Sequence, residues 1–203
     1  MSQLTPQFFQ TILKMEGDYQ KMPDDNGNYS CGALVGTNMG VSGVALTDWY
    51  GRCVSEDEVR GLDQHTAFEF YAWYFDKYNL YHVQDQKFAE FLMNNTMGSP
   101  AGAARAEQKA LNRLGYSVSV DGQRGPQTIQ ALNDAWKKNP AGIYNAVRGE
   151  WIKHLESINK PQFLDGWMIR LNKWFPPLST TGASLGSALL ILLAFLGWKL
   201  YKA

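Results

Sequence analysis

Residues 5–27 read TPQFFQTILKMEGDYQKMPDDNG, and this stretch decides what kind of fold the chain builds. Thr5 and Pro6 form a typical helix start, an N-cap threonine followed by proline at the first helical position. Apolar residues then recur at helical spacing on one face, at Phe8, Phe9, Ile12, Leu13 and Met15. Glu16 ends the helix, and the Gly, Asp and Asn residues that follow it predict a loop. The stretch therefore predicts a carboxylate at a helix end, facing a loop that carries two more carboxylates.

Helix start signals of the same kind recur along the rest of the chain. A capping box, Ser55 to Glu58, opens a helix that is predicted to run to Lys77 with a break near Gly61. Further helices are predicted over residues 84–93, 99–114, 125–136, 140–155 and 161–174. Residues 17–54 read as a long loop with a short hairpin around 34–46. These signals predict a mainly α-helical domain with a small loop and hairpin region.

The charges are unevenly distributed, although the 203-residue chain has no net charge. Residues 1–100 contain 6 Lys and Arg against 13 Asp and Glu, whereas residues 101–178 contain 11 against 6. An acidic half followed by a basic half argues against nucleic acid as the main partner. Aromatic residues make up 13% of the chain, and such side chains either pack in a core or stack on sugar rings.

Cys31 and Cys53 are too few for a disulfide scaffold. Both lie in loop-like sequence, so one bridge can form in an oxidising compartment, whereas the lack of a cleavable signal peptide favours free thiols. The three histidines, His65, His82 and His154, do not have the spacing of metal ligands. We therefore expect neither a metal site nor a cofactor.

Residues 182–198 read GASLGSALLILLAFLGW and carry no charge. With its neighbours this segment is long enough to cross a hydrocarbon core of about 30 Å. Trp198, Lys199 and Tyr201 suit the membrane interface. A buried core helix is the alternative, but the segment has no polar face. We expect a transmembrane helix at 182–201, which would bind membrane lipid and anchor the protein by a single C-terminal span.

Glu16 is the best candidate for an acid that cleaves a glycosidic bond. Such cleavage needs a proton donor beside the leaving oxygen, and a second group that stabilises the sugar cation or activates a water. A carboxyl that follows an apolar helix can sit partly desolvated. Asp24 or Asp25 can face it across the turn, and Thr37 can orient a water. Spacing alone also fits a plain helix-end carboxylate followed by turn aspartates.

The residues around Glu16 resemble glycoside hydrolase family 108, whose motif is E-G-G-Y-x-N-D-P-x-D-P-G-G-x-T-x-x-G-I-[ST]. The segments that carry the resemblance are Lys14–Tyr19, Pro23–Gly27 and Gly36–Ser42. In the second half, Gln108–Asn112 and Val120–Thr128 are similar to the peptidoglycan-binding-type region of the same family. The resemblance extends over roughly residues 5–170.

Members of this family are N-acetylmuramidases, often phage or prophage lysozymes, which cleave the β-1,4 bond between N-acetylmuramic acid and N-acetylglucosamine. The resemblance implies a lysozyme-like two-lobed fold with peptidoglycan as its partner. Glu16 matches the catalytic glutamate, and Asp25 and Thr37 match the acidic and threonine positions of the motif. Further candidates for contact with the glycan are Tyr19, Asp24, Trp73, Tyr74 and Asn95.

The sequence also departs from the family motif. Asp18 replaces the second glycine, and Met22 replaces an aspartate whose role is lost or moves to Asp24. Residues 29–35 are inserted before the glycine that precedes Thr37. None of these changes affects Glu16, so the second catalytic group is less well defined than the first.

The expected organisation is a catalytic lobe at 1–98, a helical second lobe at 99–175, a linker at 176–181 and the transmembrane helix at 182–201, placed in a host membrane or in the virion membrane of a phage. Two alternatives to a hydrolase stay open. One is a lytic transglycosylase of the same fold, which releases an anhydro-muramyl product. The other is a catalytically dead wall-binding protein of a membrane or virion. The mass of the product and a lysis assay separate the three.

Overall fold

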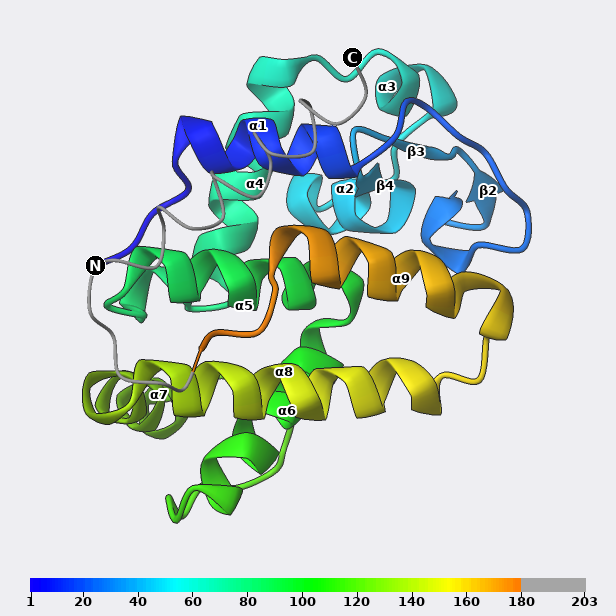
Figure 1. The fold of residues 1–203 in the computed structure, drawn as a ribbon. Coiled ribbons are helices and arrows are strands. Elements are labelled where there is room, and N and C mark those ends of the chain that lie inside the picture. Colours follow the sequence, from blue (N-terminus) through cyan, green and yellow to red (C-terminus); the bar gives the residue numbers. More distant parts are fainter. Residues whose placement is uncertain (180–203) are drawn as a thin grey trace, which may run out of the picture.

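A computed structural model describes residues 1–179, which fold into α-helices with two small β-hairpins (Figure 1). In the first half the helices are α1 (Pro6–Met15), α2 (Gly43–Tyr50), α3 (Glu56–Arg60), α4 (Gln64–Lys77) and α5 (Gln86–Gly98), with 3-10 turns η1 (Asn26–Asn28) and η2 (Leu80–His82). In the second half they are α6 (Pro100–Arg113), α7 (Pro126–Lys138), α8 (Pro140–Ser157) and α9 (Pro161–Trp174). The expected mainly helical architecture is confirmed.

Helix α1 forms as its sequence predicts. The Thr5 side chain accepts a hydrogen bond from the Phe8 N–H at 3.1 Å, which satisfies one of the free donors at the helix start. Phe8, Phe9 and Ile12 are buried against the core. The backbone becomes extended at Glu16, whose N–H still donates to the Ile12 carbonyl at 2.9 Å. The glutamate side chain therefore projects from a rigid helix end.

The segment after α1 is more ordered than the sequence predicts. It forms the antiparallel hairpins β1 (Tyr29–Ser30) with β2 (Ala33–Leu34) and β3 (Thr37–Asn38) with β4 (Val41–Ser42), and then helix α2. The Ser42 hydroxyl caps α2 by accepting from the Ala45 N–H at 3.3 Å. The expected single hairpin around 34–46 is thus replaced by two shorter hairpins and a helix that packs on them. The N-cap residue of this helix, Ser42, lies among Gly, Asn and Ser residues that are typical of a loop, so the sequence did not indicate a helix start there.

A disulfide joins Cys31 to Cys53, with their Cα atoms 5.7 Å apart. This corrects the preference for free thiols. Cys31 lies in the turn between β1 and β2, and Cys53 follows α2. The bridge therefore ties the inserted hairpin to the end of α2, a contact that no local sequence pattern specifies.

Both halves of the chain share one hydrophobic core. Buried apolar side chains from Leu4 to Phe175 form a single connected cluster, to which α5, α6 and α8 contribute heavily. Helix α9 runs alongside α8 and lies between α8 and the layer that contains α1, α2 and the hairpins (Figure 1). The last described helix is thereby brought back to the first.

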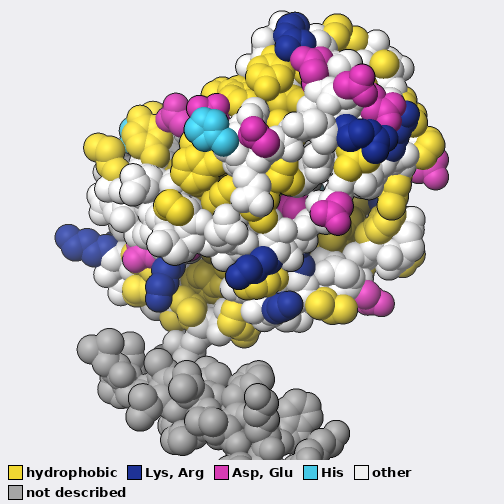
Figure 2. All heavy atoms as spheres, turned by 90° about the horizontal axis from the view of Figure 1, so that it is seen from above, with side chains coloured by type: hydrophobic (Ala, Val, Ile, Leu, Met, Phe, Trp, Pro, Cys, Tyr) yellow, Lys and Arg dark blue, Asp and Glu magenta, His cyan; other side chains and the backbone are white. Residues whose placement is uncertain are grey.

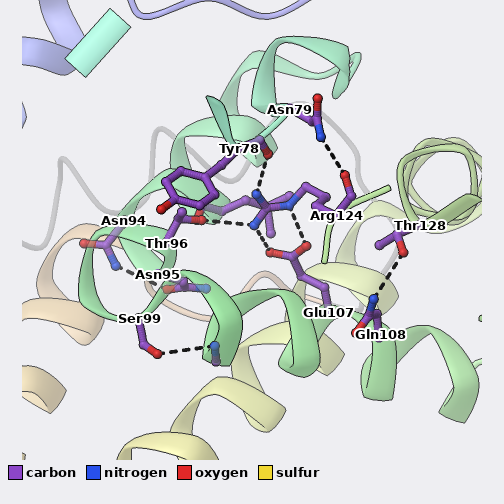
Figure 3. Close-up of polar contacts among 12 residues, drawn as sticks. Tyr78, Asn79, Asn94, Asn95, Thr96, Ser99, Glu107, Gln108, Arg124 and Thr128 are labelled. Atoms are coloured by element: carbon purple, nitrogen blue, oxygen red, sulfur yellow. Dashed lines mark hydrogen bonds and ion pairs between the residues drawn. The ribbon is translucent and has the colours of Figure 1, made fainter. Parts of the chain in front are cut away.

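A buried polar network holds the second half to the first. Arg124 lies within the motif Asp121–Thr128, and its guanidinium donates to both carboxylate oxygens of Glu107, at 2.7 and 2.5 Å. It also donates to the Tyr78 carbonyl at 2.7 Å and to the Thr96 hydroxyl at 3.0 Å (Figure 3). These contacts give the motif a structural role, because its arginine links α6 to α5 and to the end of α4.

Charged side chains of both signs lie on the same face of the molecule. Seen from the top of Figure 1, acidic and basic side chains are intermixed with hydrophobic ones (Figure 2). Ion pairs form both within the first half, as between Lys21 and Glu56 at 2.5 Å, and between the halves, as between Arg170 and Glu16 at 2.7 Å. The basic second half of the sequence therefore supplies an ion-pair partner to a carboxylate of the acidic first half.

The expected transmembrane helix has to be corrected. Within residues 1–179, no helix is both long enough and apolar enough to cross a bilayer. The longest of them, α8, has 18 residues and includes Arg148 and Glu150, whereas a span needs about 20 predominantly apolar residues. Residues 182–201, where the span was expected, lie outside the described part of the chain. The membrane anchor, the contact with membrane lipid and the membrane localisation are therefore withdrawn.

Candidate active site

Glu16 lines a hollow of about 200 Å³ between the two halves of the molecule. The first half contributes Gly40 from the turn after β3, together with Asn94 and Met97 from α5. The second half contributes Trp151, Leu155 and Ile158 from α8 and the following turn, and Trp167, Arg170 and Leu171 from α9. Trp151 is buried, with 3% exposed, whereas Trp167 is half-buried. A carboxylate beside an accessible indole ring is a suitable setting for a sugar, because aromatic rings offer flat apolar faces with a polar edge.

The size of this hollow indicates how a substrate occupies it. Pockets that enclose a whole ligand typically measure roughly 300–1,000 Å³, so a hollow of about 200 Å³ holds only part of a chain-like substrate. The remainder of a glycan strand would lie along the surface on either side. Glu16 itself remains accessible, since 20% of its side chain is exposed.

The Glu16 carboxylate is ion-paired with Arg170. The Arg170 Nη1 lies 2.7 Å from Glu16 Oε1, and 29% of the arginine side chain is exposed. The same guanidinium donates through Nε to the Asn94 side-chain oxygen at 3.1 Å. Asn94 is buried and donates in turn to the Asn95 side-chain oxygen at 3.3 Å. The pair is therefore a built part of the hollow, with α5 holding the arginine from the side.

Gly40 and Tyr71 pack against the carboxylate. A Cβ atom at position 40 would lie 2.5 Å from Glu16 Cγ and 2.5 Å from the Tyr71 hydroxyl oxygen, so only glycine fits there. The Tyr71 hydroxyl donates to the Met39 carbonyl at 2.9 Å. Burial raises the pKa of Tyr71 well above its usual value, and the charge of Glu16 raises it further. Tyr71 is therefore a neutral phenol at the back of the site.

Thr37 lies on β3, in the hairpin whose turn contacts Glu16, whereas Asp25 caps η1 in the loop after α1, and neither lines the hollow. Thr37 pairs with Ser42 across β3 and β4, and its hydroxyl donates to the Asn28 side-chain oxygen at 2.6 Å. The Asp25 carboxylate accepts from the Gly27 N–H at 2.9 Å. A Cβ at Gly27 would lie 3.1 Å from Asp25 Oδ1 and 3.4 Å from Ser42 Cβ. Asp25 thus lies close to the end of the hairpin at which Thr37 pairs with Ser42.

The other candidate residues lie away from the hollow around Glu16. The Tyr19 hydroxyl donates to Glu56 at 3.0 Å, and the Tyr74 hydroxyl donates to the Thr96 carbonyl at 3.1 Å. Trp73 lies under the Lys77 ammonium, whose nitrogen is 4.6 Å from the ring centre. Asp24 is exposed, whereas Asn95 is almost fully buried, with 1% exposed. The structure does not bring these five side chains together.

Two larger hollows lie on either side of the Asp121–Gly125 loop, with volumes of about 420 and 330 Å³. Both are lined mainly by amide, small and basic side chains, and the larger includes the lone carboxylate of Asp134. Neither pairs a carboxyl with aromatic side chains.

A third hollow, of about 360 Å³, places Asp76 beside Phe68, Phe75 and Tyr81, but Asp76 is exposed whereas Glu16 is partly shielded. A partly desolvated carboxyl is the better proton donor, so the hollow at Glu16 is the better candidate for glycosidic chemistry despite its smaller size. Among the described residues, no cluster of His, Cys, Asp or Glu could hold a metal ion.

Most of the site residues that the sequence did not predict come from segments far from Glu16 in the chain. Arg170, Trp167, Trp151 and Asn94 carry no recognisable spacing relative to Glu16 in the sequence. Gly40 is the exception, because it occupies the glycine position of the G-I-[ST] part of the family motif. A local pattern could therefore have identified the hairpin contact, but not the wall formed by α8 and α9.

Comparisons with known proteins agree with this arrangement. Residues 9–99, which contain Glu16 and the hairpins, match the family model described as Glycosyl hydrolase 108, and residues 102–172 match the model described as Predicted Peptidoglycan domain. The chain thus contains a glycosyl hydrolase 108 domain followed by a peptidoglycan domain. No curated protein matches it.

A solved structure is similar to this chain over most of its length. The structure of Brucella abortus SagA matches with a TM-score of 0.68 and 26% sequence identity, covering 83% of this chain and 89% of that one. With its glycosyl hydrolase 108 domain, the protein is a glycoside hydrolase, an N-acetylmuramidase that acts on the β-1,4 bond of peptidoglycan. The expected phage origin finds no support in these matches and stays a prediction.

Proposed function

We propose that Glu16 is the general acid that protonates the glycosidic oxygen of the peptidoglycan strand. The observation that carries this proposal is the position of the Glu16 carboxyl at the rigid end of α1, in a hollow lined by both halves of the chain. The half-buried indole of Trp167 offers a surface for a sugar ring beside it. The two lobes, residues 1–98 and 99–175, would then grip one glycan strand between them.

The second group would come from the cap of η1 or from the nearby β3–β4 hairpin. Asp25 has one carboxylate oxygen committed to the Gly27 N–H, which leaves the other free to stabilise a sugar cation or to act on a water. The Thr37 hydroxyl proton is committed to Asn28, so its oxygen can still accept a hydrogen bond from a water. A strand that enters the hollow from the hairpin side would pass both groups.

Replacing Glu16 with glutamine tests the acid. Glu16→Gln keeps the shape and can still accept a hydrogen bond from Arg170, but it cannot donate a carboxyl proton. We expect turnover of purified peptidoglycan to fall at least about 10²-fold, since general acids contribute roughly 10²–10⁴-fold. Asp18→Asn is the matched control, because it removes an exposed carboxylate two residues away. Wild-type turnover in Glu16→Gln would refute the assignment.

Cleavage without water is the second candidate mechanism. It is favoured by one observation, that Asp24, Asp25 and Thr37 all lie outside the hollow that contains Glu16. A hydrolase adds a water to the muramyl end, whereas a transglycosylase releases an anhydro product that is lighter by one water. Mass spectrometry of the released fragments decides between the two mechanisms.

A further inference from the structure

The segment that matches the peptidoglycan domain reaches into the active site. Arg170 lies within residues 102–172 and contacts Glu16 at 2.7 Å. Trp167 and Leu171, on the same helix, line the same hollow. Glu16 thus lies in the segment that matches one family model, and Arg170 lies in the segment that matches the other. One hydrophobic core nevertheless joins the two segments.

We propose that Arg170 is a positioning residue for the Glu16 carboxyl, so that the second half of the chain completes the catalytic site instead of serving only to hold the wall. This inference rests on the proposed role of Glu16 as the proton donor. It assigns to the second half a part in the chemical step itself.

The geometry explains what the arginine would do. Its Nη1 donates to Oε1 of Glu16, which leaves Oε2 as the oxygen that carries the proton towards the substrate. In the reaction, that proton moves to the glycosidic oxygen, and the bond from this oxygen to the sugar carbon breaks with its electron pair left on the oxygen. Glu16 becomes a carboxylate, and the guanidinium already in place stabilises the new charge. Such a preset group needs no rearrangement during the reaction.

The surroundings hold the arginine in this orientation. Asn94 accepts from the Arg170 Nε at 3.1 Å, so the guanidinium is fixed by two partners on different elements. Arginine suits this task, because its donors are arranged in a rigid fork and it stays charged, whereas lysine is a flexible point charge. Tyr71 is a further ionisable side chain at the carboxylate, and burial and the charge of Glu16 both raise its pKa, so it stays neutral.

Steady-state kinetics of the full chain on purified peptidoglycan test the proposal. We expect Arg170→Ala to lower kcat about 10²-fold with little change in KM, because the lost interaction acts in the transition state. Arg170→Lys should recover only part of kcat, and added methylguanidinium should restore activity to Arg170→Ala but not to Arg170→Lys. Lys173→Ala is the control, since this exposed residue of α9 has its ammonium 5.0 Å from the Trp174 ring centre and should behave as wild type.

Other outcomes would overturn the proposal. A raised KM with unchanged kcat would make Arg170 part of the substrate-binding wall. A loss of kcat that methylguanidinium does not restore, together with a lower thermal unfolding temperature, would make the pair structural. Failure of the underlying assignment looks different, because Glu16→Gln would then remain active. If Glu16→Gln is inactive while Arg170→Ala keeps wild-type kcat, only this inference fails.

Discussion

Gly40 determines how closely the β3–β4 hairpin approaches the Glu16 carboxyl. Its φ of +75° lies in the left-handed region, which side-chain-bearing residues rarely adopt. The space is closed as well, because a Cβ atom would meet Glu16 Cγ and the Tyr71 hydroxyl oxygen, both at 2.5 Å. The backbone angle and the lack of space both restrict position 40, which lies against the proposed catalytic acid. A substitution of Gly40 should therefore affect both stability and activity.

Gly40→Ala should therefore displace the Glu16 side chain. We expect a loss of about 1–3 kcal/mol in the free energy of unfolding from backbone strain and a fall in wall-lytic activity larger than this destabilisation explains. Urea unfolding and turbidity assays on the same samples measure both. Gly17→Ala is the control, since a Cβ there has nothing within 4 Å. Equal activity in the two variants would contradict the prediction.

Glu16 could be identified from the sequence because the helix start and the apolar spacing that place it are both local patterns. The N-cap at Thr5 and the apolar spacing set the length of α1, and the length of α1 sets where the carboxylate emerges. Arg170 has no such local signal, because an arginine in an amphipathic helix normally lies on the solvent-facing side and does not indicate a site. Its contact with Glu16 depends on the path that the chain takes through α6, α7 and α8.

At the scale of elements, α3 holds the loop between α1 and the first hairpin. The Glu56 carboxylate accepts from Lys21 at 2.5 Å, from Arg60 at 2.8 Å and from the Tyr19 hydroxyl at 3.0 Å. These hydrogen bonds, with that from Lys21 the largest influence, lower the pKa of Glu56 from 4.5 to about 2. The loop that carries Asp25 is therefore tethered by a carboxylate that must stay ionised.

This tether predicts a dependence of stability on acid. The folded pKa of Glu56 lies below its unfolded value, so its contribution is fully present above about pH 4.5 and is lost as the pH falls towards about 2. Urea unfolding of wild type should therefore show a larger loss of stability between pH 6 and pH 3 than that of Glu56→Gln. The control Asp57→Asn, on the same helix, should follow wild type. An unchanged loss in Glu56→Gln would contradict the prediction.

Most helices were predictable from the sequence, and the hairpin region was not. The starts of α1, α3, α6, α7, α8 and α9 follow cap residues or proline at the first helical position, which act within one turn of backbone. The hairpins have two-residue strands, too short for an alternating pattern to show. Helix α2 and the Cys31–Cys53 bridge depend on packing against those hairpins.

At the scale of the whole molecule, the buried network around Arg124 joins the two halves, and within it Arg124 is ion-paired with Glu107 of α6. Both side chains are almost completely buried, with 2% and 0% exposed. The arginine also contacts the Tyr78 carbonyl and the Thr96 hydroxyl, so that its donors are well satisfied. Thr96 lies on α5, the helix that also carries Asn94 and Met97 of the hollow at Glu16.

Removing one partner of this pair should strongly destabilise the protein. Glu107→Gln leaves the buried guanidinium without its counter-charge, and breaking such pairs costs about 3–5 kcal/mol. Arg52→Met, which breaks an ion pair whose two side chains are 57% and 37% exposed, should cost far less, because exposed pairs contribute little to stability. Urea unfolding at neutral pH measures both. A similar small cost for both variants would show that Arg124 does not lock the halves together.

The sequence by itself determined the helical class, the helix boundaries set by caps, and the position of Glu16 at a helix end, because these depend on contacts within a few residues. The family motif extended this to the hairpin glycine and to peptidoglycan as substrate. Only the tertiary structure decided that Arg170, Trp167 and Asn94 meet Glu16, that Arg124 serves a buried network, and that the two cysteines are bonded. Those contacts join segments far apart in the chain, and their geometry is set by how the shared core packs.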